Sequence, residues 1–525
     1  MDGKENGNLN PKANKPSRSS RPPGSTKRRK LKSEAPCEPP SKSCLDRLPP
    51  EILDMICEES SGQNIPALRL QCRYLCKIAT AHLLRSVVVR FKKTSIESLL
   101  QLSSHPQLSQ NVRTIIYEPN LLERQSRQAW EKGIPLRDYH EISDIPAPPK
   151  QSASQREWRL YHRSLKKAVC RHDRGPYSPQ ELDAAWPIYQ RYLQEQGDLV
   201  HRDNACQDLS RAVQRFPNLS ALHVNFGFGL WCGPGWSPDT RVNPYGDGLC
   251  QAFSTAHGDG ATPGVEQIVS LINMLDTVDV KLASLRIGNL SWRFFLQYVE
   301  DHIGKSELFY AIKRVLQSLR DIKLVITTWS SLVNYDDDDE DSEVLEYFEV
   351  EECRAYLDRG SLGRILSGAP DLHKLAIEFD ANMTKSPIDF QYLVLDTHWS
   401  HLHTIELDSV DAHEDDWIEF FKRHATSLKY VSVAAIRLMD GNWPDVLERM
   451  QDLLNLEEAH FDKELWGVAP KQIWRLDPTD WTSSKDDSVQ ENRTRWALEK
   501  FMVHGGVCPL RDEETHPQTT GWDEF

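Results

Sequence analysis

The side chains of this 525-residue chain that could do chemistry gather in a few short stretches. His201-Arg-Asp-Asn204 has the residue order of a phosphoryl-transfer loop, in which the Asp accepts a hydroxyl proton. Gly227-x-Gly229 has the spacing at which a glycine loop approaches a phosphate closely. Asp239, Asp247 and Asp259 follow in a stretch rich in Gly, Pro and Trp. Carboxylates act as general acids and bases when they converge in one pocket.

The residues around these stretches do not complete any of the motifs. A dinucleotide loop needs a helix whose N-terminus holds the pyrophosphate, but Gly233-Pro-Gly-Trp-Ser-Pro238 excludes that helix. Residues 201–204 have no glycine-rich loop upstream and no Asp-Phe-Gly downstream. The sequence also lacks a Gly-x-Ser-x-Gly elbow and a Walker phosphate loop. We therefore expect no catalytic residues and no enzyme, with the Trp-rich stretch 226–260 as the alternative location of an active site.

Metal ligands are expected to be absent for a similar reason. Cys72 and Cys76 lie one helical turn apart, and His398, His401 and His403 cluster, but a structural zinc site needs four ligands in paired spacings. The acidic run 336–341 lacks the central glycine of a calcium loop. The sequence thus predicts reduced core cysteines, surface or strand histidines, and no cofactor.

Composition indicates an intracellular protein with a folded body. Hydrophobic residues make up 39% of the chain, which includes 15 Trp, and no apolar run reaches the roughly 18 residues of a membrane span. Residues 1–43 hold eleven Lys and Arg against four acids, so their net charge is +7. Because the whole chain carries −14, residues 44–525 carry −14 − 7 = −21. An acidic body of this kind is not expected to bind nucleic acid, and the lack of a long apolar run predicts no membrane interaction.

The basic segment 1–43 has almost no large apolar residues and is expected to be disordered. A dense group of cations within it suits recognition by a nuclear-import receptor, although a solvated basic tail would have the same composition. The predicted location is accordingly the nucleus, the cytoplasm or both. The residues of this candidate import signal are Lys27, Arg28, Arg29, Lys30 and Lys32.

The elements that organise the chain begin directly after this tail, in residues 44–91. Pro49 and Pro50 suit a first helical turn, and Ile52, Leu53 and Ile56 then repeat with helical spacing. Asn64 offers a cap for a following helical stretch, which carries an apolar stripe. A unit of about 45 residues rarely buries enough surface to be stable alone, so its apolar faces need a partner. The stripe consists of Leu68, Cys72, Leu75, Ala79 and Leu83.

Residues 44–91 resemble an F-box, although an ordinary amphipathic helix pair in a larger core would show similar periodicity. The resemblance rests on Leu48-Pro-Pro-Glu-Ile-Leu-x-x-Ile56, on Leu68-Arg-Leu70 in a second helix, and on Cys72-x-x-Leu75-x-x-Ile78-Ala79 in a third. It implies binding to the Skp-type linker of a cullin-RING ubiquitin ligase. The residues expected at that interface are Leu48, Pro49, Glu51, Ile52, Leu53, Ile56, Leu68, Leu70 and Leu75.

A second pattern follows, because the template L-x-x-L-x-L of leucine-rich repeats recurs along the chain. In such repeats a short strand and a helix stack on their neighbours, and the parallel strands line one concave side. The C-terminal part, including Trp496 to Phe501, also resembles filamentous-fungal F-box proteins with degenerate repeats. The matches start at Val112, Leu219, Leu282, Leu319, Leu372, Leu402, Leu428 and, weakly, Leu456.

We therefore expect an α/β fold in which a short helical F-box precedes an irregular leucine-rich-repeat solenoid with long insertions. Residues 120–200, 225–264 and the acidic run 336–341 interrupt the repeats, and the acidic run is either a solvated loop or a docking patch for a basic partner segment. The expected divisions are a disordered tail at 1–43, the F-box at 44–91, a first repeat with a hydrophilic insert at 92–215, repeats at 216–470, and a C-terminal helix and tail at 471–525.

The function expected from these resemblances is that of a non-enzymatic adaptor of an SCF-type ubiquitin ligase. The F-box would bind the Skp-type linker and, through it, the cullin scaffold, while the repeats would bind a protein substrate whose identity the sequence does not reveal. Ubiquitin transfer would then depend on proximity to a separate charged enzyme. Two alternatives are an F-box scaffold outside ubiquitin transfer and an enzyme that uses residues 226–260.

Overall fold

The computed structural model describes most of the folded body and leaves out several long segments. The N-terminal tail with its basic run, the stretches 134–178, 227–262 and 328–351, and the C-terminal end fall outside it. The described residues are 45, 48–60, 64–119, 121–122, 124, 126–133, 179–201, 204–226, 263–278, 280–298, 307–327, 352–379, 388–468, 472–476 and 487–511.

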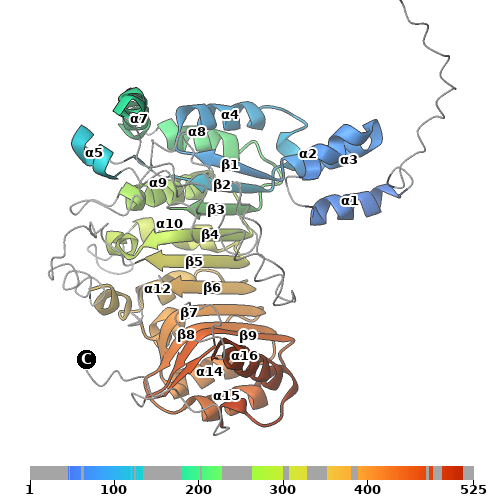
Figure 1. Cartoon of the computed structure of the whole chain (residues 1–525), viewed down its shortest axis with the longest axis vertical. Helices are drawn as coiled ribbons and strands as arrows, with labels where there is room; N and C mark the ends of the chain where they lie inside the picture. Colours follow the sequence, from blue (N-terminus) through green and yellow to red (C-terminus); the bar gives the residue numbers. More distant parts are fainter. Residues whose placement is uncertain are drawn as a thin grey trace, which may run out of the picture.

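The fold is mixed α/β and is built on one ten-stranded sheet whose spatial order equals the order along the chain. Neighbouring strands from β1 to β9 are parallel, and only β10 is antiparallel to its neighbour β9. Figure 1 shows the strands stacked from β1 at the top to β9 at the bottom. Their bounds are β1 Ser86–Arg90, β2 Thr114–Glu118, β3 Ala221–Asn225, β4 Ser284–Ser291, β5 Asp321–Thr327, β6 Lys374–Phe379, β7 Thr404–Ala412, β8 Tyr430–Leu438, β9 Glu458–Trp466 and β10 Ile473–Arg475.

Helices precede, separate and follow the strands. Parallel neighbours need such a crossover connection, whereas antiparallel strands can be joined by a tight turn. The helices are α1 Pro50–Glu59, α2 Asn64–Gln71, α3 Arg73–Leu83, α4 Lys93–Ser103, α5 Arg127–Gly133, α7 Pro179–His201, α8 Asn204–Val213, α9 Pro263–Val278, α10 Glu307–Leu316, α12 Ser361–Leu366, α13 Phe390–Val394, α14 Glu414–His424, α15 Trp443–Leu453 and α16 Asp487–His504, with short 3-10 turns at η2 Ser109–Asn111, η5 Trp292–Tyr298 and η6 Pro509–Arg511.

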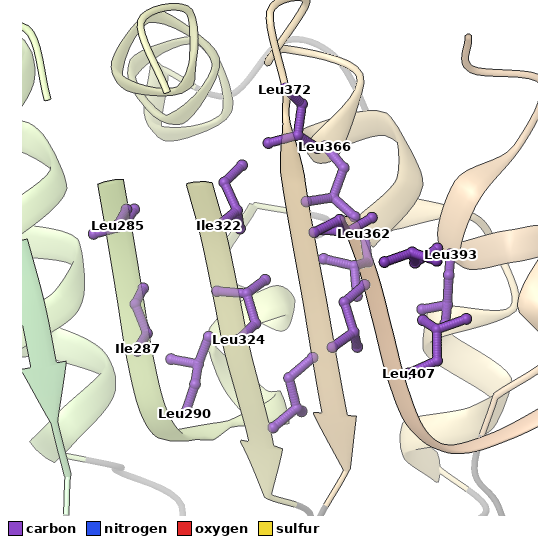
Figure 2. Close-up of a cluster of buried hydrophobic side chains, with 14 of the residues drawn as sticks. Leu285, Ile287, Leu290, Ile322, Leu324, Leu362, Leu366, Leu372, Leu393 and Leu407 are labelled. Carbon is purple, nitrogen blue, oxygen red and sulfur yellow. The ribbon is translucent and has the colours of Figure 1, made fainter. Parts of the chain in front are cut away.

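The eight predicted templates coincide with strands, and their second apolar positions are direct neighbours across the sheet. Each of these side chains is at most 6% exposed and belongs to one continuous core. Figure 2 shows side chains of β4 and β5, such as Leu285 and Ile322, in the same buried cluster as Leu362 and Leu366 of α12. The row consists of Ile115, Leu222, Leu285, Ile322, Leu375, Ile405, Val431 and Ala459.

A repeated hydrogen-bond arrangement aligns the starts of the strands. The carbonyl of the residue directly before one strand accepts two backbone N–H groups from the residues that open the next strand. The N···O distances range from 2.7 to 3.2 Å. Because the same arrangement recurs at every step from β1 to β9, all parallel strands begin at one straight edge. The accepting carbonyls belong to Arg85, Arg113, Ser220, Ala283, Arg320, His373, His403 and Lys429.

Helix α14 illustrates how the sequence forms these connections. Its first turn is acidic and its last turn is basic, which complements the partial charges at the two helix ends. Its apolar face is buried, since Trp417, Phe420, Phe421 and His424 are all 0% exposed. This face anchors α14 on the sheet and leaves its charged residues outside.

The two edges of the sheet are blocked in different ways. At β1 the hydroxyl of Ser95 accepts the outward N–H of Arg90 at 3.0 Å. At β9 the carboxylate of Glu499, on α16, accepts the N–H of Phe461 at 3.3 Å. Helix α16 also buries Leu498 in the main core. Strand β10 had no counterpart among the sequence expectations for 471–525, since a three-residue strand carries no detectable alternation and depends on its pairing with β9.

Four strands each contain a non-glycine residue whose backbone lies in the left-handed region. These residues are Asn289 in β4, Ser409 in β7, Ala435 in β8 and Lys463 in β9, with φ between 50° and 61°. The pairing register shifts near two of them, between Ile287 and Leu290 and between Ala434 and Ile436. These irregularities are β-bulges, which bend a strand and redirect the side chains that follow.

Helices α1 to α3 form a separate small unit. Its central side chains, Cys57, Ile65 and Ala79, make a cluster apart from the main core. Figure 1 shows the unit beside β1, projecting away from α5 and α7. The helix expected after Pro49 is confirmed, and the stripe from Leu68 to Leu83 is divided between α2 and α3, because Cys72 is extended and caps α3.

The hydrophilic insert expected at 120–200 is described only in part, and its described helices share an aromatic cluster. The ring centroids of Trp130 and Trp186 are 5.2 Å apart, and Tyr189 stacks on Trp186 at 5.3 Å. Gln196 connects α7 to the sheet, since it accepts the N–H of Leu122 at 2.7 Å and donates to the carbonyl of Phe91 at 3.3 Å. Residues 134–178 of this insert lie outside the described residues.

Candidate protein-binding surfaces

The structure describes all nine residues expected at a linker interface, and their side chains differ in how exposed they are. Ile52 and Leu70 are 41% and 86% exposed, and Pro49 and Glu51 are exposed as well. Leu48, Ile56 and Leu68 are half-buried. Leu53 and Leu75 are each 2% exposed, so in the free chain they hold the helices of the unit together.

The three helices of the unit are fixed relative to one another by contacts between α1 and α3. The hydroxyl of Tyr74 donates to the carbonyl of Leu48 at 3.4 Å, close to the start of both helices. Further along, His82 Nε2 lies 2.6 Å from Asp54 Oδ1, and an Arg85–Glu58 ion pair follows, also at 2.6 Å. The helices therefore run side by side in the same direction.

Large apolar side chains are unusually concentrated on the outside of this unit. Of the eleven that the described part exposes, four lie between residues 52 and 74: Ile52, Met55, Leu70 and Tyr74. Met55 and Tyr74 were not among the expected interface residues, although Ile52, Met55 and Ile56 have the i, i+3, i+4 spacing of one helix face. A small unit that exposes this many large apolar side chains is typical of an interaction site in a soluble protein. These four residues are called the apolar patch below.

The cysteines of the unit serve packing and capping. Burial raises the pKa of the Cys57 thiol, and the nearby Asp54 carboxylate raises it further. Cys72 Sγ accepts the N–H of Leu75 at 3.4 Å and so caps α3. A raised pKa lowers the thiolate fraction, and the thiolate is the reactive form. Cys57 is therefore a packing residue.

A second candidate surface is the face of the sheet turned away from the helices, called the open face here. Its charged side chains pair across neighbouring strands: Arg286 with Asp321 at 2.7 Å, and Lys323 with Glu378 at 3.4 Å. Lys374 and Glu406 pair in the same way between β6 and β7. The open face therefore has a polar surface on which cations and anions largely satisfy each other.

Two acidic side chains of β6 and β7, Glu378 and Asp408, are partly desolvated. Burial raises the pKa values of Glu378 and Asp408, and the ammonium groups of Lys323 and Lys463 counteract part of this effect. Lys463 reaches Asp408 from β9, two strands away, across the small side chain of Ala434. The bulge at Lys463 gives its side chain this direction.

The residues considered for catalysis and metal binding do not form a site in the described part of the chain. Residues 201 and 204 end α7 and begin α8, and Gly227, Gly229 and the three aspartates of 226–260 lie outside the described residues. Among described residues, no group of three or more His, Cys, Asp or Glu side chains is arranged to hold a metal ion. His398 and His401 are exposed and His403 is half-buried.

None of the helices described is long and apolar enough to cross a membrane. No protein-family model matches the chain, and a search of curated proteins found no match to it.

Proposed function

We propose that this protein is a substrate-recognition adaptor of an SCF-type cullin-RING ubiquitin ligase. In this proposal α1 to α3 act as an F-box that binds the Skp-type linker, and the sheet presents a surface for a protein substrate. The observation that carries the proposal is the apolar patch, because a small unit with its own core exposes Ile52, Met55, Leu70 and Tyr74 together.

The arrangement of the rest of the chain supports the second half of the proposal. Eight templates of the leucine-rich type lie on parallel strands in one register, and each strand neighbours only those before and after it. Degenerate leucine-rich repeats that stack in this way form extended binding surfaces. The protein would then hold a substrate at one end and the linker at the other, and catalysis would be supplied by proximity.

The test is co-purification of the full chain with a Skp-type linker, using substitutions that leave the core of the unit intact. Ile52→Ser with Leu70→Ser removes two exposed side chains, each of which contributes about 1.5 to 3 kcal/mol when buried on a partner. We expect at least a hundredfold loss of affinity by titration calorimetry, with unchanged circular dichroism.

The matched control carries the same change at exposed apolar residues elsewhere, Tyr310→Ser with Val468→Ser, and should bind as the wild type does. If the wild-type chain does not bind the linker, the ligase proposal fails. A chain that binds the linker but does not promote ubiquitin transfer to any bound client would instead be an F-box scaffold.

A further inference from the structure

Two histidines from different connections meet at the edge where the parallel strands begin. His373 directly precedes β6, and its carbonyl accepts the N–H groups of His403 and Thr404 at the start of the next strand. His401 lies in the turn that leads into β7. The ring centroids of His373 and His401 are 5.5 Å apart, and the ring planes differ by 19°. These two residues are called the histidine pair here.

The ring nitrogens of the histidine pair are available to a ligand. Both residues are exposed. His373 Nδ1 lies 2.7 Å from the carbonyl of Asp371, and because a carbonyl only accepts, this nitrogen carries the proton. The Nε2 atom of the neutral His373 ring therefore keeps its lone pair. The His401 side chain makes its ring contact with His373 and no hydrogen bond or ion pair to any residue that the structure describes.

The geometry of the pair fits two ligands of one metal ion. Metal-binding histidines usually donate their second ring N–H to a carbonyl or carboxylate, which orients the ring, and the carbonyl of Asp371 has this role for His373. A zinc ion about 2.1 Å from one nitrogen of each ring, at a tetrahedral angle, would set the ring centroids about 5.3 Å apart. The centroids already lie 5.5 Å apart. Rotation of the two side chains is therefore sufficient, and the backbone does not have to move.

The charged residues around the pair are compatible with a bound cation. Asp371 is exposed two positions before His373, and Glu457 and Glu458 are exposed where the same edge continues into β9. Arg320, which precedes β5, is exposed, so solvent and salt screen its charge. Residues 44–525 carry −21 in total, which favours the approach of cations over that of anions.

We propose that the histidine pair binds a divalent transition-metal cation of the zinc and copper class, through one imidazole nitrogen of each residue. Imidazole suits these metals, whereas magnesium and calcium prefer oxygen ligands. No third His, Cys, Asp or Glu side chain of the described part joins the pair in a metal-binding arrangement. Water would complete the coordination, so the ion exchanges more readily than in a four-ligand structural site. The pair includes no residue of the helical unit, and this proposal is independent of linker binding.

The experiment measures how fast diethyl pyrocarbonate modifies individual histidines of the full chain, by peptide mass spectrometry, with and without zinc chloride. A nitrogen bound to Zn²⁺ cannot react, so we expect the modification of His373 and His401 to slow at least fivefold. A chelator should restore both rates, and Mg²⁺ at the same concentration should leave them unchanged. His504, which is exposed on α16, is the internal control and should react at the same rate throughout.

Single substitutions test whether the two histidines act together. His401→Gln should abolish the protection of His373, and His373→Gln, which can still donate to the carbonyl of Asp371, should abolish that of His401. The matched control His105→Gln changes an exposed histidine elsewhere and should keep the protection of both. The proposal is overturned if Zn²⁺ does not protect the wild-type pair or protects His504 equally. Protection of His373 that persists in His401→Gln would show independent binding and would also reject it.

Discussion

At the scale of single residues, His424 shows how a histidine becomes part of a core. Its side chain is 0% exposed, its Nε2 accepts the N–H of Trp399 at 3.1 Å, and its Nδ1 lies 2.9 Å from the carbonyl of Phe420. Both contacts are satisfied by the neutral ring with the proton on Nδ1. Burial lowers the pKa of His424 to about 4, because the charged form would be desolvated.

This shift predicts a loss of stability in mild acid. The unfolded chain binds a proton at His424 near pH 6.5, whereas the folded chain does so only near pH 4. The contribution is therefore complete above pH 6.5 and falls as the pH decreases from there towards 4. When the pH falls from 7 to 5, we expect the titration of His424 to lower the free energy of unfolding by about 2 kcal/mol.

The measurement is urea unfolding of the wild type and of His424→Gln at both pH values. Gln can accept from Trp399 and donate to Phe420 but does not titrate. The variant should lose less stability between pH 7 and pH 5 than the wild type. Parallel losses in the two proteins would contradict the prediction. His223, whose pKa burial also lowers to about 4, is unchanged in both and cancels in the comparison.

At the scale of elements, the bulges predict a substitution that stabilises the sheet. Ala435 in β8 has φ +50°, a conformation that costs an L-residue roughly 1 kcal/mol and glycine almost nothing. Ala435→Gly should therefore raise the free energy of unfolding by about 0.5 to 1 kcal/mol, measured by chemical denaturation.

The adjacent residue supplies a control of opposite sign. Ala434 lies in the same strand and has no positive φ, so Ala434→Gly should lower stability by about 0.5 to 1 kcal/mol through the greater flexibility of glycine. Equal destabilisation by both substitutions would show that the backbone at Ala435 is not strained.

The elements also show what could be predicted from the sequence. The strands at Ile322, Leu375 and Ile405 were predictable because parallel strands buried on one face carry apolar residues at fixed spacing. Cys72 was predicted as part of a continuous stripe but interrupts it, since its extended backbone separates α2 from α3. The bulge at Ala435 has no glycine or other local sign in the sequence.

The candidate surfaces were less predictable than the fold for a physical reason. Leu53 and Leu75 have the same apolar character and similar spacing as Ile52 and Leu70, but only the packing of three helices decides which of them is buried. The alignment of the residues that directly precede β5, β6, β7 and β8 was not recognised from the sequence, because these residues are separated by 26 to 53 positions and meet only through strand register.

At the scale of the whole molecule, the sheet depends on α16 to close its C-terminal end. Truncation after residue 486 removes α16, whose Leu498, Phe501 and Met502 are buried in the main core at about 1.5 to 3 kcal/mol each. It also frees the N–H of Phe461 at the edge of β9. Exposed strand edges pair with other chains. We expect the truncated chain to form soluble aggregates in light-scattering chromatography.

Truncation after Arg511 is the matched control, because it removes only residues that lie outside the described part. That shorter chain should elute as the full-length protein does. Indistinguishable elution of all three proteins would show that α16 does not protect the edge.

The order of the strands has a consequence for how the protein is made. Each strand from β2 to β9 pairs with the strand synthesised just before it and the strand synthesised just after it. The strands therefore leave the ribosome in the order in which they pair. Strand β2, for example, can complete its pairing as soon as β3 has been synthesised. The nascent sheet can lengthen at one growing end, and α16, which covers that end, is the last α-helix of the described part to emerge.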